Sequence, residues 1–416
     1  MPRPTKAVPG HRRSRRRRGR FSDRHLLIGE GFFSGTATAT HNAFFVTLLV
    51  QLNVGSLALG IYTSLNGLLA NASGLAGGRL RRHIPNRRTL AALTGGLGRL
   101  GFLLIALLLY LQGPDVSVPL LIVIALLSVT LIGLGLPVLT SVIADSVNPR
   151  ERGYFFANRL LASGIGAAIV AIGIAALLRQ MTFPDGFMIA YLLAAFAGVG
   201  SAMTLLSLRR VRTEPVTGTR GAAGYGLFGS VSALMWRYAG STFILFFGAA
   251  LVAPVLTPYI LNDLGAGPSF IGLMAAVNAV TALLVQRFWG RRVDRFGSFP
   301  VIATTMAAVS SLPVLYALTP TYWLALGFEV ISGVAWAGYA LANLNYAIEI
   351  APAEDRAHYT SVSNAAAGAG SFLGPLAAAA MLTFLEPEIL LILSGVIRFA
   401  AFLSIRFARP PAQATA

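Results

Sequence analysis

The chain contains no cysteine, and only 12% of its 416 residues are charged. Without cysteine the sequence predicts no disulfide framework, no thiolate metal site and no thiol nucleophile. The five histidines are widely scattered, so it predicts no zinc site either. Soluble domains carry roughly twice this fraction of charged residues. The scarcity of charge therefore argues against a soluble fold, against intrinsic disorder and, in spite of the net charge of +18, against an ordinary basic domain that binds nucleic acid.

Apolar residues are abundant instead, at 55% of the chain, and the mean hydropathy is +0.69. A helix needs about 20 mostly apolar residues to cross a bilayer, and twelve stretches of the sequence meet that requirement. Within them the apolar residues do not alternate, and Ala, Leu and Gly dominate, so we expect helices rather than barrel strands. The twelve predicted spans are 29–51, 57–77, 89–112, 118–145, 154–178, 187–208, 238–262, 269–289, 300–319, 322–350, 358–385 and 387–407.

One long polar connection lies midway along the chain and divides the spans into six and six. The sequence therefore predicts an all-α polytopic membrane protein, with twelve transmembrane helices in two pseudo-symmetric six-helix bundles. We expect five parts along the chain, namely a basic disordered tail at 1–28, an N-terminal bundle at 29–208, a linker at 209–237, a C-terminal bundle at 238–407 and a short tail at 408–416.

The distribution of Arg and Lys predicts the orientation, because cations in short loops stay on the cytoplasmic side. Thirty of the 33 cations fall on or beside the loops of one side, Arg179 falls on the other, and Arg99 and Arg398 lie inside spans. We therefore expect a multi-pass protein of the cell (inner) membrane with both termini and the 209–237 linker in the cytoplasm.

The two halves of the sequence align as a repeat. At an offset of 212 residues, segment 52–79 aligns with 264–291 without a gap, and Asn66 meets Asn278. At an offset of 204 a second block aligns and pairs charged residues near helix ends, Asp145 with Glu349 and Arg152 with Arg356. Matched polar positions at matched places in the topology indicate a duplication. Two related six-helix halves are typical of transporters, in which the substrate binds near the midplane between the halves.

The segment after the eighth span reads Gly290-Arg291-Arg292-Val293-Asp294-Arg295-Phe296-Gly297. This string is similar to the G-x-x-x-D-R-x-G loop motif of the major facilitator superfamily. The twelve spans, their division into six and six and the long central loop extend the resemblance over nearly the whole chain. The resemblance implies alternating access by rocking of two bundles, with the first, fourth, seventh and tenth spans lining the cavity.

The resemblance also implies a cytoplasmic latch between the halves, to which Gly290, Asp294, Arg295 and Gly297 belong. We expect Asp145 and Glu349, which end the fourth and tenth spans, to add ion pairs to this latch with Arg152 and Arg356. In the first-half copy of the motif, Arg82 stands where the family usually has Asp. That copy therefore cannot form the latch in the same way.

Polar side chains inside the predicted cavity spans are the candidates for binding a substrate, because a polar group within a span is costly. The tenth span carries four of them at spacings of 3, 4 and 3, which places them on one helix face. The alternative is that these side chains satisfy one another at a helix interface, and the sequence does not separate the two. The candidates are His41 and Asn42 in the first span, Tyr259 and Asn262 in the seventh, and Trp336, Tyr339, Asn343 and Tyr346 in the tenth.

Two charges lie deep in the second half, Glu329 in the tenth span and Arg398 near the middle of the twelfth. A pairing between them would leave neither buried charge alone. The pair would be either an inert salt bridge or a protonatable switch.

These observations predict a secondary transporter of a small organic solute and not an enzyme, with export of amphipathic compounds preferred because the presumed cavity carries few fixed charges. The alternatives are an uptake permease for a nutrient or metabolite and a non-transporting sensor or scaffold with this fold. The absence of a Walker sequence argues against a primary pump. We expect no cofactor and no metal, a monomer in the bilayer, and a proton or cation as a candidate coupling ion.

The predicted topology has a direct test, since any introduced cysteine is the only one in the chain. The single variant Pro114→Cys should react with a membrane-impermeant maleimide added outside intact cells. Arg220→Cys should react only after the membrane is permeabilised. The reverse pattern would overturn the orientation.

Overall fold

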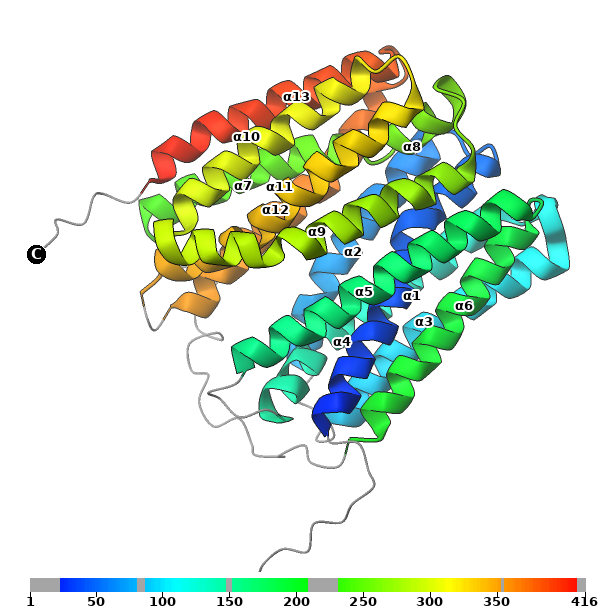
Figure 1. The fold of residues 1–416 in the computed structure, drawn as a ribbon, viewed down its shortest axis with the longest axis horizontal. Coiled ribbons are helices and arrows are strands. Elements are labelled where there is room, and N and C mark those ends of the chain that lie inside the picture. Colours follow the sequence, from blue (N-terminus) through cyan, green and yellow to red (C-terminus); the bar gives the residue numbers. More distant parts are fainter. Residues whose placement is uncertain (1–22, 81–86, 147–151, 209–230, 353–354, 410–416) are drawn as a thin grey trace, which may run out of the picture.

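The computed structural model of this protein describes residues 23–80, 87–146, 152–208, 231–352 and 355–409 (Figure 1). This part of the chain is helical throughout, with no strand among the described residues. Its twelve long helices confirm the predicted fold class of an all-α membrane protein in two bundles.

The first half contains six long helices and one short turn. They are α1 (Asp23–Gln51), α2 (Ser56–Leu80), α3 (Arg87–Gln112), η1 (Gly113–Asp115), α4 (Val118–Ser146), α5 (Arg152–Gln180) and α6 (Asp185–Leu206).

The second half repeats this plan with more interruptions. Its elements are α7 (Ala233–Leu251), α8 (Leu256–Pro258), η3 (Tyr259–Asp263), α9 (Pro268–Phe296), α10 (Ser298–Ala317), η4 (Tyr322–Leu324), α11 (Ala325–Glu349), α12 (Arg356–Met381), α13 (Pro387–Ser404) and η5 (Ile405–Ala408).

Nine segments of the described chain are both long enough and apolar enough to cross a membrane. The remaining long helices, α1, α2 and α12, have 29, 25 and 26 residues, which exceeds the span of a bilayer core. Each of the twelve predicted spans thus overlaps one of the twelve long helices.

Several helix boundaries differ from the sequence prediction. α1 begins at Asp23 rather than 29 and α7 at Ala233 rather than 238, so the last residues of the predicted tail and linker are helical. The seventh span was expected to be continuous over 238–262, but α7 ends at Leu251 and the chain resumes as a short helical turn and a π-helical turn ending at Asp263. Pro254 and Pro258 explain the break, because neither residue can donate a backbone hydrogen bond. The eighth span was expected to end at 289, but α9 continues to Phe296. The motif from Gly290 onward is therefore the end of a helix rather than a loop.

The helix starts agree with the sequence repeat. α2 starts at Ser56 and α9 at Pro268, which is the offset of 212, and α5 starts at Arg152 and α12 at Arg356, which is the offset of 204. The helix pairings follow the same relation, because α1 packs on α5 and α6 in the first half as α7 packs on α12 and α13 in the second. Between the halves, α2 packs on α12 and α5 packs on α9. Because α2 corresponds to α9 and α5 to α12 in the repeat, these two contacts are equivalent.

The two halves share a hydrophobic core at one end only. One buried cluster combines Phe44 and Leu49 of the first half with Ile260, Phe270 and Leu390 of the second. We call this the joined end; it carries the connections after α1, α7 and α12. In Figure 1 the two bundles lie together there, at the upper right, and diverge toward the lower left.

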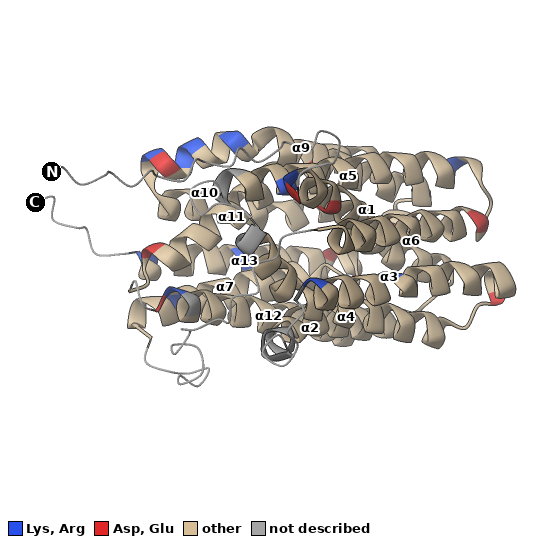
Figure 2. Ribbon diagram, turned by 90° about the horizontal axis from the view of Figure 1, so that it is seen from below, with Lys and Arg blue, Asp and Glu red and all other residues tan. Residues whose placement is uncertain are grey.

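At the opposite end, which we call the split end, each half has a core of its own. The first-half cluster includes Leu27, Val142 and Leu205, and it contains no second-half residue. The second-half cluster includes Tyr238 and Tyr346 and contains no first-half residue. Figure 2 marks basic residues along the split end of α9, whereas at the joined end it marks acidic residues beside α3 and α6 and a basic one at the end of α5.

Small residues allow the helices of the two halves to approach closely. A Cβ atom built on Gly60 of α2 would lie 2.9 Å from the carbonyl oxygen of Pro375 and would also overlap Ala379, both in α12. The neighbouring Ser64 donates a hydrogen bond to the carbonyl of Phe372 in the same helix. This close backbone approach is the usual way in which helices associate within a membrane.

Gly60→Ala should therefore force α2 and α12 apart and weaken the joined end. Overpacking of this kind costs about 1–3 kcal/mol, which corresponds to roughly a 5-fold or larger shift in a two-state ratio. The measurement is the alkylation rate of Val255→Cys, a position that is 2% exposed at the joined end, and this rate should rise in the Gly60→Ala background.

Gly173→Ala in α5 is the matched control, because a Cβ atom there has no neighbour within 4 Å. An unchanged alkylation rate in Gly60→Ala would contradict a tight contact between α2 and α12.

Candidate functional site

Glu329 of α11 lies in a network of neutral hydrogen-bond donors within the second half. Asn278 of α9 donates to Oε2 at 2.6 Å, and the Tyr316 hydroxyl of α10 donates to Oε1 at 2.7 Å. Asn278 also donates to the Ser332 hydroxyl at 3.0 Å. Three helices thus position a carboxylate that has no cationic partner in the described part of the chain.

The predicted ion pair between Glu329 and Arg398 is wrong. Arg398 is 5% exposed, and its guanidinium donates to the carbonyls of Val309 at 3.2 Å and Ala249 at 3.4 Å. Both carbonyls lack their usual helical partner: the residue four positions after Val309 is Pro313, and α7 ends two residues after Ala249. Arg398 therefore satisfies backbone acceptors, and Tyr316 is the residue that interacts electrostatically with both charges.

The first half contains a buried charged network that the sequence analysis missed. Glu30 of α1 is fully buried, and Arg159 of α5 donates to its Oε2 through Nε at 3.0 Å and through a second, shorter bond. Ser201 of α6 donates to Oε1 at 3.0 Å. Arg99 of α3, 5% exposed, donates to the Ser34 hydroxyl at 2.6 Å and interacts electrostatically with Glu30 and Arg159.

The sequence did contain a signal for this network. Glu30 and Arg159 each fall within the first two turns of a predicted span, at 29–51 and 154–178, and a charge inside a span needs a partner. In the predicted orientation, Arg159 counts among the cations of the neighbouring loop, although it lies inside the predicted span 154–178. Glu30 and Arg159 can pair because their helices, α1 and α5, pack against each other.

The polar face of α11 is packed inside the second half. Tyr339 and Tyr346 are 2% and 1% exposed and belong to the core cluster of the split end. Tyr238 of α7 donates to Oδ1 of Asn343, and Tyr346 donates to the carbonyl of Ala408. Trp336 is partly exposed and packs on Phe246 and Tyr339. Tyr339 and Tyr346 therefore lie at a helix interface, which was the alternative to a place in the cavity.

The two neighbouring candidates on α1 face different surroundings. His41 is 3% exposed and lies 3.2 Å from the Tyr62 hydroxyl and 3.5 Å from the Tyr191 hydroxyl, with Phe102 stacked on its ring. His41 is therefore a core residue of the first half rather than a cavity residue. Asn42 is exposed, because adjacent residues of a helix point about 100° apart.

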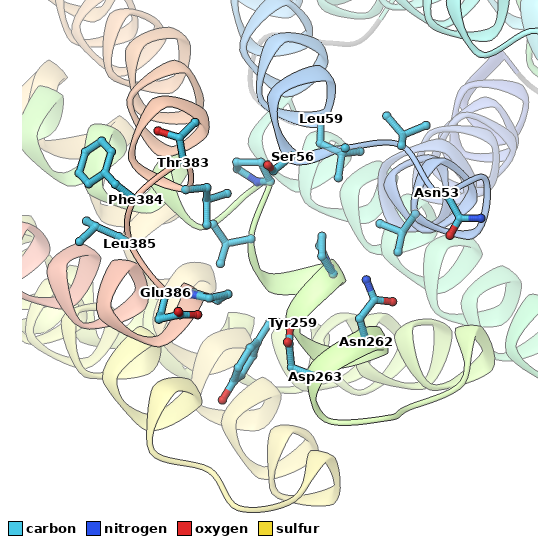
Figure 3. Close-up of a pocket in the computed structure, with 18 residues that line it drawn as sticks. Asn53, Ser56, Leu59, Tyr259, Asn262, Asp263, Thr383, Phe384, Leu385 and Glu386 are labelled. Carbon is cyan, nitrogen blue, oxygen red and sulfur yellow. The ribbon is translucent and has the colours of Figure 1, made fainter.

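Tyr259 and Asn262 lie at the joined end, where they line a cavity of about 580 Å³ (Figure 3). The cavity is formed where three corners of the chain meet: the turn between α1 and α2, the interrupted segment after α7, and the turn between α12 and α13. Two predicted cavity residues thus do line a cavity, but near the end of the bundles and away from Asn42 and α11.

The predicted latch residues lie at the split end. Gly290, Asp294 and Arg295 occupy the last turns of α9, and Gly297 ends the helix with a φ of 79°. Asp294 and Arg295 are exposed, and Asp294 makes no hydrogen bond or ion pair with any described residue. The Arg295 guanidinium lies 5.1 Å from the centre of the Phe296 ring.

The other predicted latch contacts are not seen or fall outside the described region. Glu349 accepts a hydrogen bond from the Ser298 hydroxyl at 2.6 Å rather than pairing with Arg356, which is exposed at the start of α12. The side chains of Asp145 and Arg152, and all of Arg82, lie outside the described residues. The latch remains a prediction.

Comparison with known proteins finds a family match. The sequence pattern of the Major Facilitator Superfamily matches residues 238–416, which covers the second bundle. The second half of the chain is thus similar to this family. This match agrees with the resemblance found in the sequence, and the long apolar helices agree with a membrane protein.

The curated relatives match a limited segment. A class C tetracycline resistance protein from Escherichia coli is 31% identical over 133 residues, which is 31% of this chain and 33% of the relative. The quinolone resistance protein NorA from Staphylococcus aureus is 29% identical over 134 residues, 32% of this chain and 34% of the relative. The aligned segment thus spans about a third of each relative.

Solved structures match over nearly the full length. The nucleoside transporter NupG has a TM-score of 0.72 at 12% identity, covering 93% of this chain and 100% of that chain. A D-xylose-proton symporter has a TM-score of 0.70 at 17% identity, covering 92% and 97%. At these identities the likeness establishes the shared fold.

The first-half network predicts a stability effect. Glu30→Gln would leave Arg99 and Arg159 without the carboxylate that compensates them, and breaking a buried pair in this way costs about 3 kcal/mol. Chemical unfolding of the purified protein should show this loss. Adding Arg159→Gln to Glu30→Gln should recover part of it, because only Arg99 then remains without the carboxylate.

Asp115→Asn is the control, because Asp115 is an exposed carboxylate at the joined end. Additive losses in the double variant would show that the two side chains do not interact.

Proposed function

We propose that the chain is a secondary transporter, which moves a small organic solute across the cell membrane by alternating access. One observation carries this proposal: the halves share a core at the joined end and have separate cores at the split end. Rocking of two rigid bundles about the contacts of α2 with α12 and α5 with α9 would close the split end and open the joined end.

We further propose that the joined end faces outward, which makes the structure an inward-facing state. The split end of α9 carries four exposed arginines, whereas carboxylates gather at the joined end, and cations favour the cytoplasmic side. The arginines are Arg287, Arg291, Arg292 and Arg295. The carboxylates are Asp115, Asp185, Asp263, Glu386 and Glu388.

Export of an amphipathic compound is the preferred direction. The curated relatives are named for resistance to tetracycline and to quinolones, and this supports an exporter here. Uptake is the second candidate, since the solved neighbours include a nucleoside transporter and a sugar symporter. A non-transporting sensor is the third, because Arg82 replaces the latch carboxylate in the first half.

Glu329 is our candidate for the residue that carries a coupling proton. Its hydrogen-bond partners Asn278 and Tyr316 are neutral, and no described cation holds it in the charged form. Glu30, by contrast, forms an ion pair with Arg159. A carboxylate that changes charge within a span is a common basis for proton relay in transporters.

Asp294 is proposed to close the split end in the other state. In the present state it is exposed on α9 and has no described partner. Closing the split end would bring a partner from the first half within reach, and a charge-assisted hydrogen bond could then form.

The proposal predicts flux of labelled compounds through proteoliposomes that contain the purified protein. A panel of amphipathic drugs, nucleosides and sugars should contain at least one substrate whose accumulation depends on a pH gradient. Glu329→Gln should abolish gradient-driven accumulation and retain exchange of substrate down its own gradient, because the variant binds but carries no proton.

Asp115→Asn, at an exposed joined-end position, should behave as the native protein. Absence of flux for every compound in the panel would favour the sensor, and loss of exchange as well as accumulation in Glu329→Gln would assign that residue to substrate binding or folding.

A further inference from the structure

We infer that the cavity at the joined end is a binding site for a lipophilic organic cation, in addition to the transport function proposed above. Its volume of about 580 Å³ is within the range of roughly 300–1,000 Å³ that is usual for small-molecule sites. The proposal concerns binding at this end and does not depend on the direction or coupling of transport.

The walls of the cavity combine apolar and polar surface. Val54 and Leu59 come from the first half, and Val255, Leu382 and Phe384 from the second. Figure 3 shows Phe384 and Leu385 on one side of the cavity and Leu59 on another. These apolar residues favour a ligand with hydrocarbon or aromatic surface, because burial of that surface removes it from water.

The polar groups of the cavity select for positive charge. Asp263 and Glu386 are both among the lining residues, and the eighteen lining residues include no Lys, Arg or His. Within the described chain, neither carboxylate forms an ion pair. Glu388 lies close enough to Asp263 to interact with it electrostatically and adds to the negative potential. Asn53, Asn262 and Thr383 supply hydrogen-bonding groups around these charges.

The interrupted helix after α7 creates this arrangement. Leu264 donates to the carbonyl of Tyr259 in the wide π-helical turn, and Ala266 donates to that of Ile260. The turn places Asn262 and Asp263 next to each other at the cavity, as Figure 3 shows. π-helical turns are rare and often occur at functional positions. Glu386 reaches the same space from the start of α13.

An occupant of the cavity would contact both halves. Ser56 and Leu59 belong to α2, whereas Tyr259 and Glu386 belong to the second half. A cation bound there would therefore stabilise the joined end against opening, since a ligand shifts a conformational equilibrium toward the state that it binds better.

The test uses the full chain in nanodiscs of zwitterionic lipid, without any gradient. Tetraphenylphosphonium and tetraphenylborate are nearly equal in size and shape and opposite in charge, and only the former should bind with measurable affinity by calorimetry. Asp263→Asn and Glu386→Gln should each weaken its binding by roughly 3-fold or more, and binding should weaken at high salt.

Asp115→Asn and Asp185→Asn are matched controls, because both residues are exposed carboxylates at the same end outside the cavity. Equal binding of the two probes, or cation binding that neither cavity variant weakens, would overturn the selection for charge.

The position of the site is tested by protection. Thr383→Cys lies in the cavity and should be alkylated more slowly when tetraphenylphosphonium is present, while Asp115→Cys should be unaffected. Cation binding without protection of Thr383→Cys would place the ligand elsewhere and refute the site. Since none of these measurements needs flux, failure of the transport proposal and failure of this site are distinguishable.

Discussion

The constraint on which this structure depends is that a bilayer offers no water to backbone groups that lack a partner. α7 ends at Leu251, so the carbonyls of its last turn need donors from elsewhere. The Ser394 hydroxyl donates to Gly248 at 2.6 Å and the Arg398 guanidinium reaches Ala249, both from α13. Arg398 also satisfies the carbonyl that Pro313 leaves free in α10. The interrupted segment that forms the cavity at the joined end is therefore possible because α13 supplies these donors within the membrane.

The halves share one helical plan but differ in their buried chemistry. In the first half, Glu30 is bound by Arg159 and compensated further by Arg99, so this network is held by charge. In the second half, Glu329 is bound by an amide and a phenol, and the nearby arginine is occupied by backbone carbonyls. The duplication fixed the helix pairings, while the charged positions diverged. Glu329 therefore lacks, among the described residues, the cationic partner that Glu30 has.

The sequence predicted the helices because hydropathy and length directly report whether a segment can cross a bilayer. It also predicted the repeat, and the starts of α2 at Ser56 and α9 at Pro268 agree with the offset found in the sequence. It did not predict side-chain partners. The spacing of Tyr339 and Tyr346 placed them on one face of α11 but could not show that α7 covers that face. Arg398 was given the wrong partner because the competing acceptors are backbone carbonyls, which a search for opposite charges does not consider.

The contacts between the halves are suited to a change of state. Gly60 of α2 approaches Pro375 and Ala379 of α12, and the side chain of Leu283 of α9 packs against Gly164 of α5, so a glycine lies at each of these contacts between the halves. Such surfaces can rotate against one another with few rotamer changes, whereas the mixed core at the joined end must separate before that end can open. In the proposed alternating access, the free energy needed to separate this core would oppose opening of the joined end. Because the cavity lies beside that core and is lined by both halves, it is the place where a bound molecule would change that preference most directly.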